Sequence, residues 1–325
     1  MDAVNTLDIQ KPTTLLESFP EKRIFTPDEF NAAEDIASTW IVFSNALTTS
    51  QFEEIDEHTG TYNTIRELWK VGHYDVALMS GALTQQHEDI LQKLSIDYAL
   101  LADVPDLSVP GLIVFDMDST AIQIECIDEI AKLAGVGELV SEVTERAMQG
   151  ELDFEQSLRQ RVSALKEADE NILEKVRSDL PLMPDLELLI AALKQYGWKT
   201  AIASGGFTYF SDYLRDKLAL DHAQSNVLEI VDGKLTGEVL GDVVSAQTKA
   251  DILHKLALQY RINIENTVAV GDGANDLIMM GAAGLGIAYH AKPKVEQQAQ
   301  TSIRFSGLGG VLCILSAQMV VNKRR

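Results

Sequence analysis

Cysteine and long apolar runs are both scarce in this sequence. Two cysteines, Cys126 and Cys313, in 325 residues cannot form a disulfide scaffold, and neither has metal-ligand spacing around it, so both are predicted to be reduced core residues. The longest apolar run, 311–321, is interrupted by Ser316 and Gln318 and is shorter than a membrane span, which favours a buried C-terminal helix. No basic segment with an apolar core follows the acidic N-terminus, so no signal peptide is expected and the cytoplasm is the expected location.

Basic residues are also in deficit. The chain has 27 Lys+Arg against 49 Asp+Glu, a formal net charge of -22. This charge repels nucleic acid and anionic membrane surfaces at long range, so neither is an expected partner. An anionic substrate would have to be held by a few local cations or a metal, because the global field opposes it. A hydrophobic content of 46% predicts a soluble globular protein of two domains, with the oligomeric state left open, a homodimer included.

Residues 1–108 are predicted to form a small N-terminal α/β domain, preceded by a polar lead-in up to about Glu21. Strands are expected at 40–43, 75–79 and 97–101, and helices at 62–71 and 85–94. No cluster of acids, histidines or glycines in this domain indicates chemistry. Its purpose stays open, and a ligand-binding regulatory module is one hypothesis because the pattern is reminiscent of small amino-acid-sensing domains.

Residues 109–325 are predicted to form a Rossmann-like α/β core with a parallel sheet. Its first strand, 111–115, is followed by an almost wholly helical stretch at about 125–184, which we expect to form a cap over the crevice. Breaks in that stretch are expected at 135–137 and at Gly150. The remaining elements are expected as strands at 198–203, 267–270, 284–289 and 301–305, helices at 208–218, 246–260 and 295–300, an Asp-Gly hairpin at 228–236 and a C-terminal helix.

Two acids, Asp116 and Asp118, stand at the carboxyl end of the first core strand. Residues i and i+2 of an extended segment point to the same side, so both are expected to project into the crevice where open α/β sheets bind ligands. That arrangement suits one acid as nucleophile or metal ligand and the other as proton donor, without deciding which. A calcium loop is excluded because it needs Gly where Ala121 stands and Glu where Ile127 stands.

Three further motifs follow at or near later strand ends. Ser-Gly-Gly at 204–206 lies between a strand and a helix, a junction that suits an anion, although alone it is more often a tight turn. Lys249 lies in the first turn of a predicted helix, against the helix dipole, which mildly favours function over a solvated face. Residues 271–276, Gly-Asp-Gly-Ala-Asn-Asp, again end a buried strand in carboxylates. The glycine-rich stretch 281–286 precedes a strand instead of following one, so it is rejected as a dinucleotide loop.

Taken together, residues 116–120, Ser204 with Gly205, Lys249 and residues 271–276 resemble the four motifs of haloacid-dehalogenase-type phosphatases. The resemblance covers the chain from about Gly111 to its end. Two further stretches, 121–129 and 152–162, are similar to those of family members that act on O-phospho-L-serine.

One arginine of the predicted cap occupies an unusual place. On a helical wheel Arg161 falls on the same face as the apolar stripe, which includes Phe154, whereas Arg159 does not. A buried arginine needs an anion. That anion is either a neighbouring Glu or a substrate carboxylate, and the pattern leaves these even; the resemblance favours the substrate. It also implies that Glu125 accepts the substrate ammonium, where an ordinary helix-start acid is the alternative, and Met148 and Phe154 either line the pocket or pack in the core.

The resemblance implies roles for the acids. Asp116 would be the nucleophile that forms a phosphoaspartyl intermediate, and Asp118 would protonate the leaving oxygen and then activate water. Mg²⁺ would be bound by Asp116, Asp272 and the backbone carbonyl of Asp118, because two carboxylates converging on a phosphoryl group need a cation. Phosphate-side contacts would come from Ser204, Gly205, Lys249 and Asn275, with Asp276 supporting the metal.

The implied activity is Mg²⁺-dependent hydrolysis of the small molecule O-phospho-L-serine to L-serine and phosphate, the last step of serine biosynthesis. Two alternatives use the same residues: phosphoryl transfer to another alcohol such as homoserine, or hydrolysis of a related small phosphate.

Overall fold

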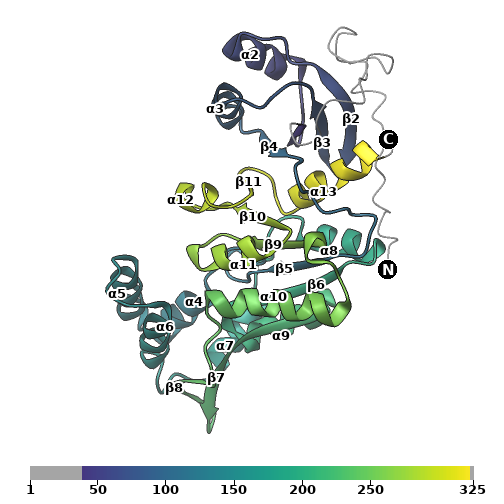
Figure 1. Cartoon of the computed structure of the whole chain (residues 1–325). Coiled ribbons are helices and arrows are strands. Elements are labelled where there is room, and N and C mark those ends of the chain that lie inside the picture. Colours follow the sequence, from purple (N-terminus) through teal and green to yellow (C-terminus); the bar gives the residue numbers. More distant parts are fainter. Residues whose placement is uncertain (1–38, 323–325) are drawn as a thin grey trace.

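The computed structural model describes residues 39–322, so the predicted lead-in up to about Glu21 lies outside the described residues. Two sheets organise this part of the chain (Figure 1): a four-stranded sheet in the order β2-β3-β1-β4 and a seven-stranded sheet in the order β11-β10-β9-β5-β6-β7-β8. The expected fold class, a mainly parallel α/β core with a helical cap after its first strand and a small N-terminal α/β part, is confirmed.

The N-terminal sheet consists of the antiparallel strands β1 to β4. Its elements are β1 (Trp40–Ser44), α2 (Thr49–Thr59), β2 (Ile65–Val71), β3 (Tyr74–Met79), α3 (Gln85–Lys93) and β4 (Asp97–Leu100). The helix predicted at 62–71 is wrong, because residues 65–71 form β2. A bulge between Ile65 and Glu67 breaks the strict alternation, so buried residues fall three and four positions apart as they would in a helix.

The seven-stranded sheet carries the predicted core. Its strands are β5 (Leu112–Phe115), β6 (Lys199–Phe207), β7 (His222–Val231), β8 (Lys234–Leu240), β9 (Thr267–Gly271), β10 (Leu285–Tyr289) and β11 (Thr301–Ile303). The central strand β5 pairs in parallel with β6 and β9, and all four of its residues are buried. Because the strands are parallel, the carboxyl ends of β6, β5 and β9 meet at one edge of the sheet.

Helices cover the two faces of this sheet. They are α8 (Leu186–Gln195), α9 (Thr208–Leu218), α10 (Ala246–Tyr260), α11 (Leu277–Ala282), α12 (Pro293–Glu296) and α13 (Gly309–Asn322). The predictions for α9 and α10 are confirmed. The helix predicted at 295–300 is shifted, because Pro293 starts α12 at its first position and the helix ends at Glu296.

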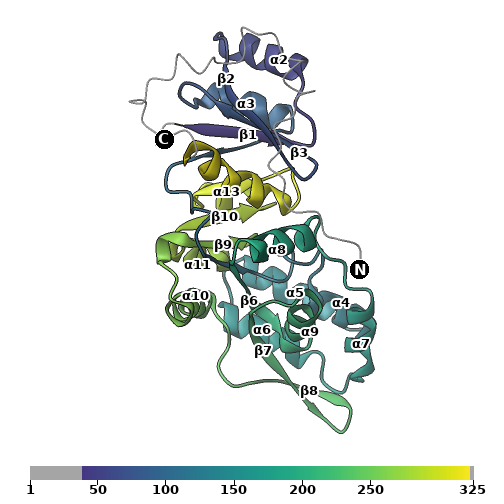
Figure 2. The ribbon, with the colours of Figure 1, turned by 90° about the vertical axis from the view of Figure 1, so that its right-hand side faces the viewer.

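The hairpin β7–β8 extends from the core on the side away from the N-terminal sheet (Figure 2). Its turn residues Asp232 and Gly233 have φ of 51° and 76°, the left-handed pair that a type I′ turn requires, as the sequence predicts.

The cap consists of four helices placed beside the carboxyl edge of the sheet (Figure 1): α4 (Cys126–Ala134), α5 (Gly137–Met148), α6 (Phe154–Ser163) and α7 (Asn171–Ser178). The expected breaks are present, with Gly135 and Gly150 both at positive φ. The segment after α6 forms two backbone hydrogen bonds to the hairpin. Glu167 N–H donates to Leu235 O and Leu235 N–H donates to Ala168 O, both at 2.9 Å. The cap is therefore tied to β8 as well as to the core.

Helix α13 lies between the two sheets (Figures 1 and 2), in contact with α8 on one side and with β1, β2 and β3 on the other. This explains its apolar sequence and confirms the expected buried C-terminal helix. Trp69 Nε1 donates to Ser316 Oγ at 2.9 Å, and the Asp97 carboxylate accepts the N–H groups of Arg304 and Ser306 at 2.7 Å. Within residues 39–322, no helix combines the length and the apolar character that a membrane crossing requires.

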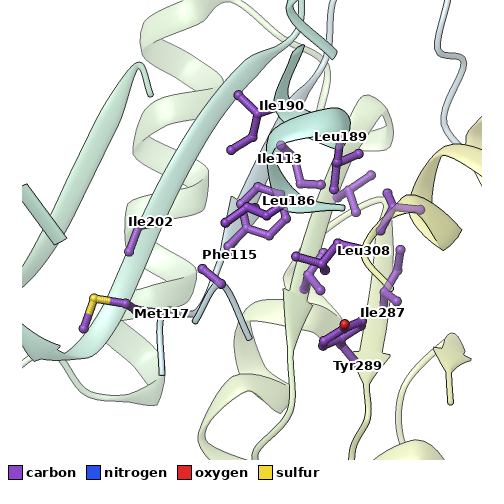
Figure 3. Packing of buried hydrophobic residues seen from close by; sticks show 14 of the residues in the cluster. Ile113, Phe115, Met117, Leu186, Leu189, Ile190, Ile202, Ile287, Tyr289 and Leu308 are labelled. Atoms are coloured by element: carbon purple, nitrogen blue, oxygen red, sulfur yellow. The ribbon is translucent and has the colours of Figure 1, made fainter. Parts of the chain in front are cut away.

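The core beneath the carboxyl edge is shown in Figure 3. Side chains from β5, β6, β10, α8 and the loop before α13 pack in one cluster, among them Ile113, Phe115, Leu186, Leu189, Ile190, Ile202, Ile287 and Leu308. This packing fixes the strand end from which Asp116 projects.

Candidate active site

The predicted site residues from different strands meet at the carboxyl edge. Asp116 follows β5 directly, and its backbone N–H donates to Val270 O of β9 at 2.9 Å. Gly271 ends β9, and Ser204 lies near the end of β6 on the other side of β5. The ends of β5 and β9, which are followed by acids, and the end of β6, which carries the glycines, are therefore neighbours in the sheet.

Lys249 is the cation of the site. It is 1% exposed, and its Nζ lies 2.8 Å from Asp116 Oδ1 and 2.7 Å from Asp276 Oδ1. Burial disfavours the charged ammonium, but the two carboxylates outweigh burial and raise the pKa of Lys249. A first-turn lysine, unfavourable to its own helix dipole, is therefore held charged inside the protein.

Three carboxylates gather around this lysine. Oxygens of Asp116, Asp272 and Asp276 all lie within 4.8 Å of one another. Burial, followed by the charges of Asp116 and Asp276, raises the pKa of Asp272 to about 7, and burial and Asp116 raise the pKa of Asp276 as well. One lysine neutralises only part of the negative charge of the three carboxylates. A set of oxygen ligands of this kind suits a hard divalent cation. The cluster of Asp116, Asp272 and Asp276 is therefore able to hold a metal.

Asp118 lies outside the carboxylate cluster. Its Oδ1 accepts the backbone N–H of Cys126 at 3.0 Å. Its Oδ2 lies so close to Gly206 that a Cβ there would approach to 2.6 Å. Burial, and then the charge of Glu125, raises the pKa of Asp118 to about 8. The carboxyl group can consequently carry a proton at neutral pH, as a general acid must.

The Ser-Gly-Gly segment lies within strand β6, whereas the sequence predicted a junction between a strand and a helix. Strand β6 continues to Phe207, with an irregular register between Ala203 and Phe207, and α9 begins only at Thr208. The buried Ser204 accepts the N–H of Gly206 on its Oγ at 2.9 Å. The anion cradle predicted here is therefore a bulged strand end and not a helix N-terminus.

Arg161 of the cap is a partly buried cation, and it forms no ion pair within residues 39–322. Its Nε is fully buried without a hydrogen-bond partner, and burial lowers its pKa against the opposing charges of Asp128 and Glu125. Arg159, by contrast, forms an ion pair with Glu155 at 2.8 Å. The internal ion pair considered for Arg161 is therefore not made.

Glu125 occupies the N-cap position of α4 without a capping hydrogen bond from its side chain, and its Oε1 accepts a hydrogen bond from the Ser119 hydroxyl at 2.8 Å. Asn275 is partly exposed beside the carboxylate cluster, and its Oδ1 would lie 2.2 Å from a Cβ on Gly273. Met148 is 69% exposed, so core packing is wrong for it. Phe154 is half-buried against the site.

Sequence reasoning missed two supporting groups. Thr120 is fully buried and donates from Oγ1 to Asp272 Oδ1 at 3.2 Å. Ser119, at φ 56°, holds Glu125. Both lie inside the acid motif 116–120, whose hydroxyls were a signal that could have been used. The hydrogen bond from the Cys126 backbone N–H to Asp118 had no such signal, because every residue type except proline has a backbone N–H.

Comparison with known proteins gives a consistent picture. A family model described as haloacid dehalogenase-like hydrolase matches residues 110–284, and a model described as a domain of unknown function matches residues 37–100. A phosphoserine phosphatase of Vibrio cholerae is 68% identical over 324 residues, which are 100% of this chain and 97% of that protein.

Two solved structures agree in fold. The crystal structure of a probable phosphoserine phosphatase from Vibrio cholerae, unliganded form, matches with a TM-score of 0.91 and 66% identity over 100% of this chain and 99% of that one. A phospho-aspartyl intermediate analogue of phosphoserine phosphatase matches with a TM-score of 0.60 and 46% identity over 63% of this chain and 98% of that one. The chain therefore belongs to the haloacid dehalogenase-like hydrolase family, on its phosphoserine phosphatase branch.

Proposed function

We propose that this protein hydrolyses O-phospho-L-serine to L-serine and phosphate with Asp116 as the nucleophile. The observation that carries the proposal is the unpaired, partly buried Arg161, which has Asp128, Glu125 and Asp118 in its electrostatic surroundings. A cation so placed, next to an acid, offers a handle for both charged groups of an amino acid. The relatives on this branch carry the same activity in their names.

In the first step, a carboxylate oxygen of Asp116 attacks phosphorus and the bond from phosphorus to the serine oxygen breaks. Lys249 holds Asp116 Oδ1 at 2.8 Å, which fixes the orientation of the carboxylate before the reaction. The product of the step is a phosphoaspartyl group and free serine.

Asp118 supplies and then retrieves the proton. With its pKa raised to about 8, it is protonated at neutral pH and gives the proton to the departing serine oxygen. As a carboxylate it then takes a proton from water, whose oxygen attacks phosphorus and releases Asp116 and phosphate.

We infer that the cation of the carboxylate cluster is Mg²⁺, held by Asp116, Asp272 and the backbone carbonyl of Asp118, with Asp276 nearby. When bound, it supplies positive charge that offsets the acids and polarises a phosphoryl oxygen. Ser204, the Gly205 N–H, Lys249 and Asn275 would receive the remaining phosphoryl oxygens.

At the other end of the substrate, Arg161 would bind the carboxylate and Glu125 the ammonium group. Glu125 is oriented for this by Ser119. The reaction is the last step of serine biosynthesis, for which the cytoplasm is the expected location.

Steady-state phosphate release from phosphoserine, phosphothreonine and a simple alkyl phosphate, with and without Mg²⁺, tests the proposal. We expect Mg²⁺-dependent release with a clear preference for phosphoserine, whereas equal rates on all three substrates would reject the serine handle. Product analysis with added homoserine separates hydrolysis from phosphoryl transfer, since transfer would yield phosphohomoserine in place of phosphate.

A further inference from the structure

Asn226 is a buried amide that contacts the backbone of Gly205, one of the residues proposed to bind the phosphoryl group. It lies in β7, opposite Phe207 of β6, and is 2% exposed. Its Nδ2 donates to Gly205 O at 2.8 Å, and its Oδ1 accepts the N–H of Val244 at 2.8 Å. Both ends of the amide are used, so its orientation is fixed.

The first of these bonds sets the peptide between Gly205 and Gly206. In a planar trans peptide the carbonyl and the N–H point in opposite directions. Asn226 holds the carbonyl, and the N–H of Gly206 then points to Ser204 Oγ at 2.9 Å. The Ser204 oxygen accepts this bond, which leaves its own hydrogen free to be donated. If the peptide were rotated, the carbonyl oxygen would face the phosphoryl group and repel it.

The second bond reaches the helix that carries the catalytic-site lysine. Val244 precedes Ser245, the N-cap of α10, whose carbonyl accepts the N–H of Lys249 at 3.0 Å. One side chain thus links the peptide at Gly205 to the first turn of α10. No other residue type of this size has a donor and an acceptor in the same planar group.

We propose that Asn226 is a positioning residue that keeps the Gly205 carbonyl out of the phosphate site and turns the Ser204 hydroxyl toward the phosphoryl group. The inference rests on the proposed phosphatase activity. It concerns only the phosphate half of the substrate, so it applies to any phosphate monoester that the site accepts.

The test uses Asn226→Asp, which keeps an acceptor for Val244 but places an oxygen against the Gly205 carbonyl. We expect kcat/KM to fall about 10- to 100-fold, the range typical of groups that orient a directly acting one. The fall should be equal for phosphoserine and p-nitrophenyl phosphate. Arg161→Ala should lower kcat/KM for phosphoserine alone.

Asn266→Ala is the matched control. This asparagine also bridges backbone groups, accepting from Asp106 N–H and donating to Val109 O, but far from the carboxyl edge. It should lower the melting temperature and leave kcat/KM unchanged. If Asn226→Asp does the same, Asn226 only stabilises the fold and the inference is wrong.

A double-mutant cycle with Ser204→Ala gives a second criterion. Since Asn226 acts partly through Ser204, the double variant should lose less than the product of the two single losses. Independent, multiplicative losses would overturn the inference. Should Asn226→Asp fail to fold, Asn226→Ala, which removes the amide without adding a polar group, is judged by the same criteria. An inactive wild-type protein would instead refute the proposed function, so the two failures are distinguishable.

Discussion

The ring of Phe154 lies against the backbone of Gly205, so closely that a Cβ on Gly205 would come within 2.6 Å of the ring's Cζ. Phe154 belongs to the cap helix α6, and Gly205 belongs to the core strand β6. The cap is therefore in contact with the strand segment proposed to bind the phosphoryl group, and this contact leaves no room for a side chain at position 205. This contact places an apolar ring beside Gly205, whose N–H is proposed to bind the phosphoryl group.

Gly205→Ala should accordingly lower kcat with little change in stability, because the added methyl displaces a cap side chain and not the core. Combining it with Phe154→Ala should recover part of the loss. Steady-state kinetics and thermal melting measure both effects. Gly206→Ala is the control, since its Cβ would meet Asp118 Oδ2 at 2.6 Å and Phe154→Ala should not rescue it. Rescue of both variants, or of neither, would contradict this account of the contact.

Arg161→Ala should weaken the apparent affinity for phosphoserine by about 2–4 kcal/mol, the cost of losing one partner of a buried charge pair. Arg159→Ala, two positions away on the same helix, should change it by less than about 0.5 kcal/mol, because Arg159 forms an exposed ion pair. Titration of the initial rate with phosphoserine measures both. Equal effects of the two variants would remove Arg161 from the substrate site.

Mg²⁺ should raise the melting temperature of the wild-type protein, because a cation relieves the repulsion among Asp116, Asp272 and Asp276. At 100 times the dissociation constant the gain is about 2.7 kcal/mol. Asp272→Asn should melt higher than wild type without metal and respond less to Mg²⁺. Differential scanning calorimetry in chelator and in excess Mg²⁺ measures this. A variant that responds like wild type would show that Asp272 is not a ligand.

His87 of the N-terminal sheet should make stability fall in mild acid. Its Nδ1 accepts the N–H of Thr84, its Nε2 lies 2.7 Å from Asn63 Oδ1, and burial lowers its pKa. The unfolded chain, with a histidine pKa of about 6.5, therefore binds the proton more readily, and stability is lost as the pH falls below about 6.5 toward the folded pKa. Urea unfolding from about pH 8 to about pH 5 should show a smaller decline for His87→Gln. An equal decline would assign the effect to other groups.

Much of the site could be predicted because its acids follow strands that are apolar and short. The strands 112–115 and 267–271 are short and fully buried, and Asp116 and Asp272 follow them directly. Strand β2 could not be predicted, because its bulge reproduces a helical spacing. Local irregularities of this kind are invisible in hydrophobic periodicity.

Long-range contacts were the other limit. Asn226 reaches Gly205 only because of the register between β6 and β7, and no local pattern distinguishes it from a surface asparagine. For Arg161 the sequence placed the side chain on the buried face but left its partner undecided. Within residues 39–322 the structure shows no ion pair for Arg161. Hydrophobic periodicity could not predict this, because it carries no information on three-dimensional neighbours.

The nucleophilic role of Asp116 is the central claim, and acid quenching during turnover tests it most directly. The protein is mixed with phosphoserine and Mg²⁺, quenched within the first turnover, digested and analysed by mass spectrometry. The account predicts a transient phosphoryl group on Asp116 of the peptide that contains residues 112–120, absent in Asp116→Asn. A phosphoryl group on another residue, or full turnover by Asp116→Asn, would contradict it.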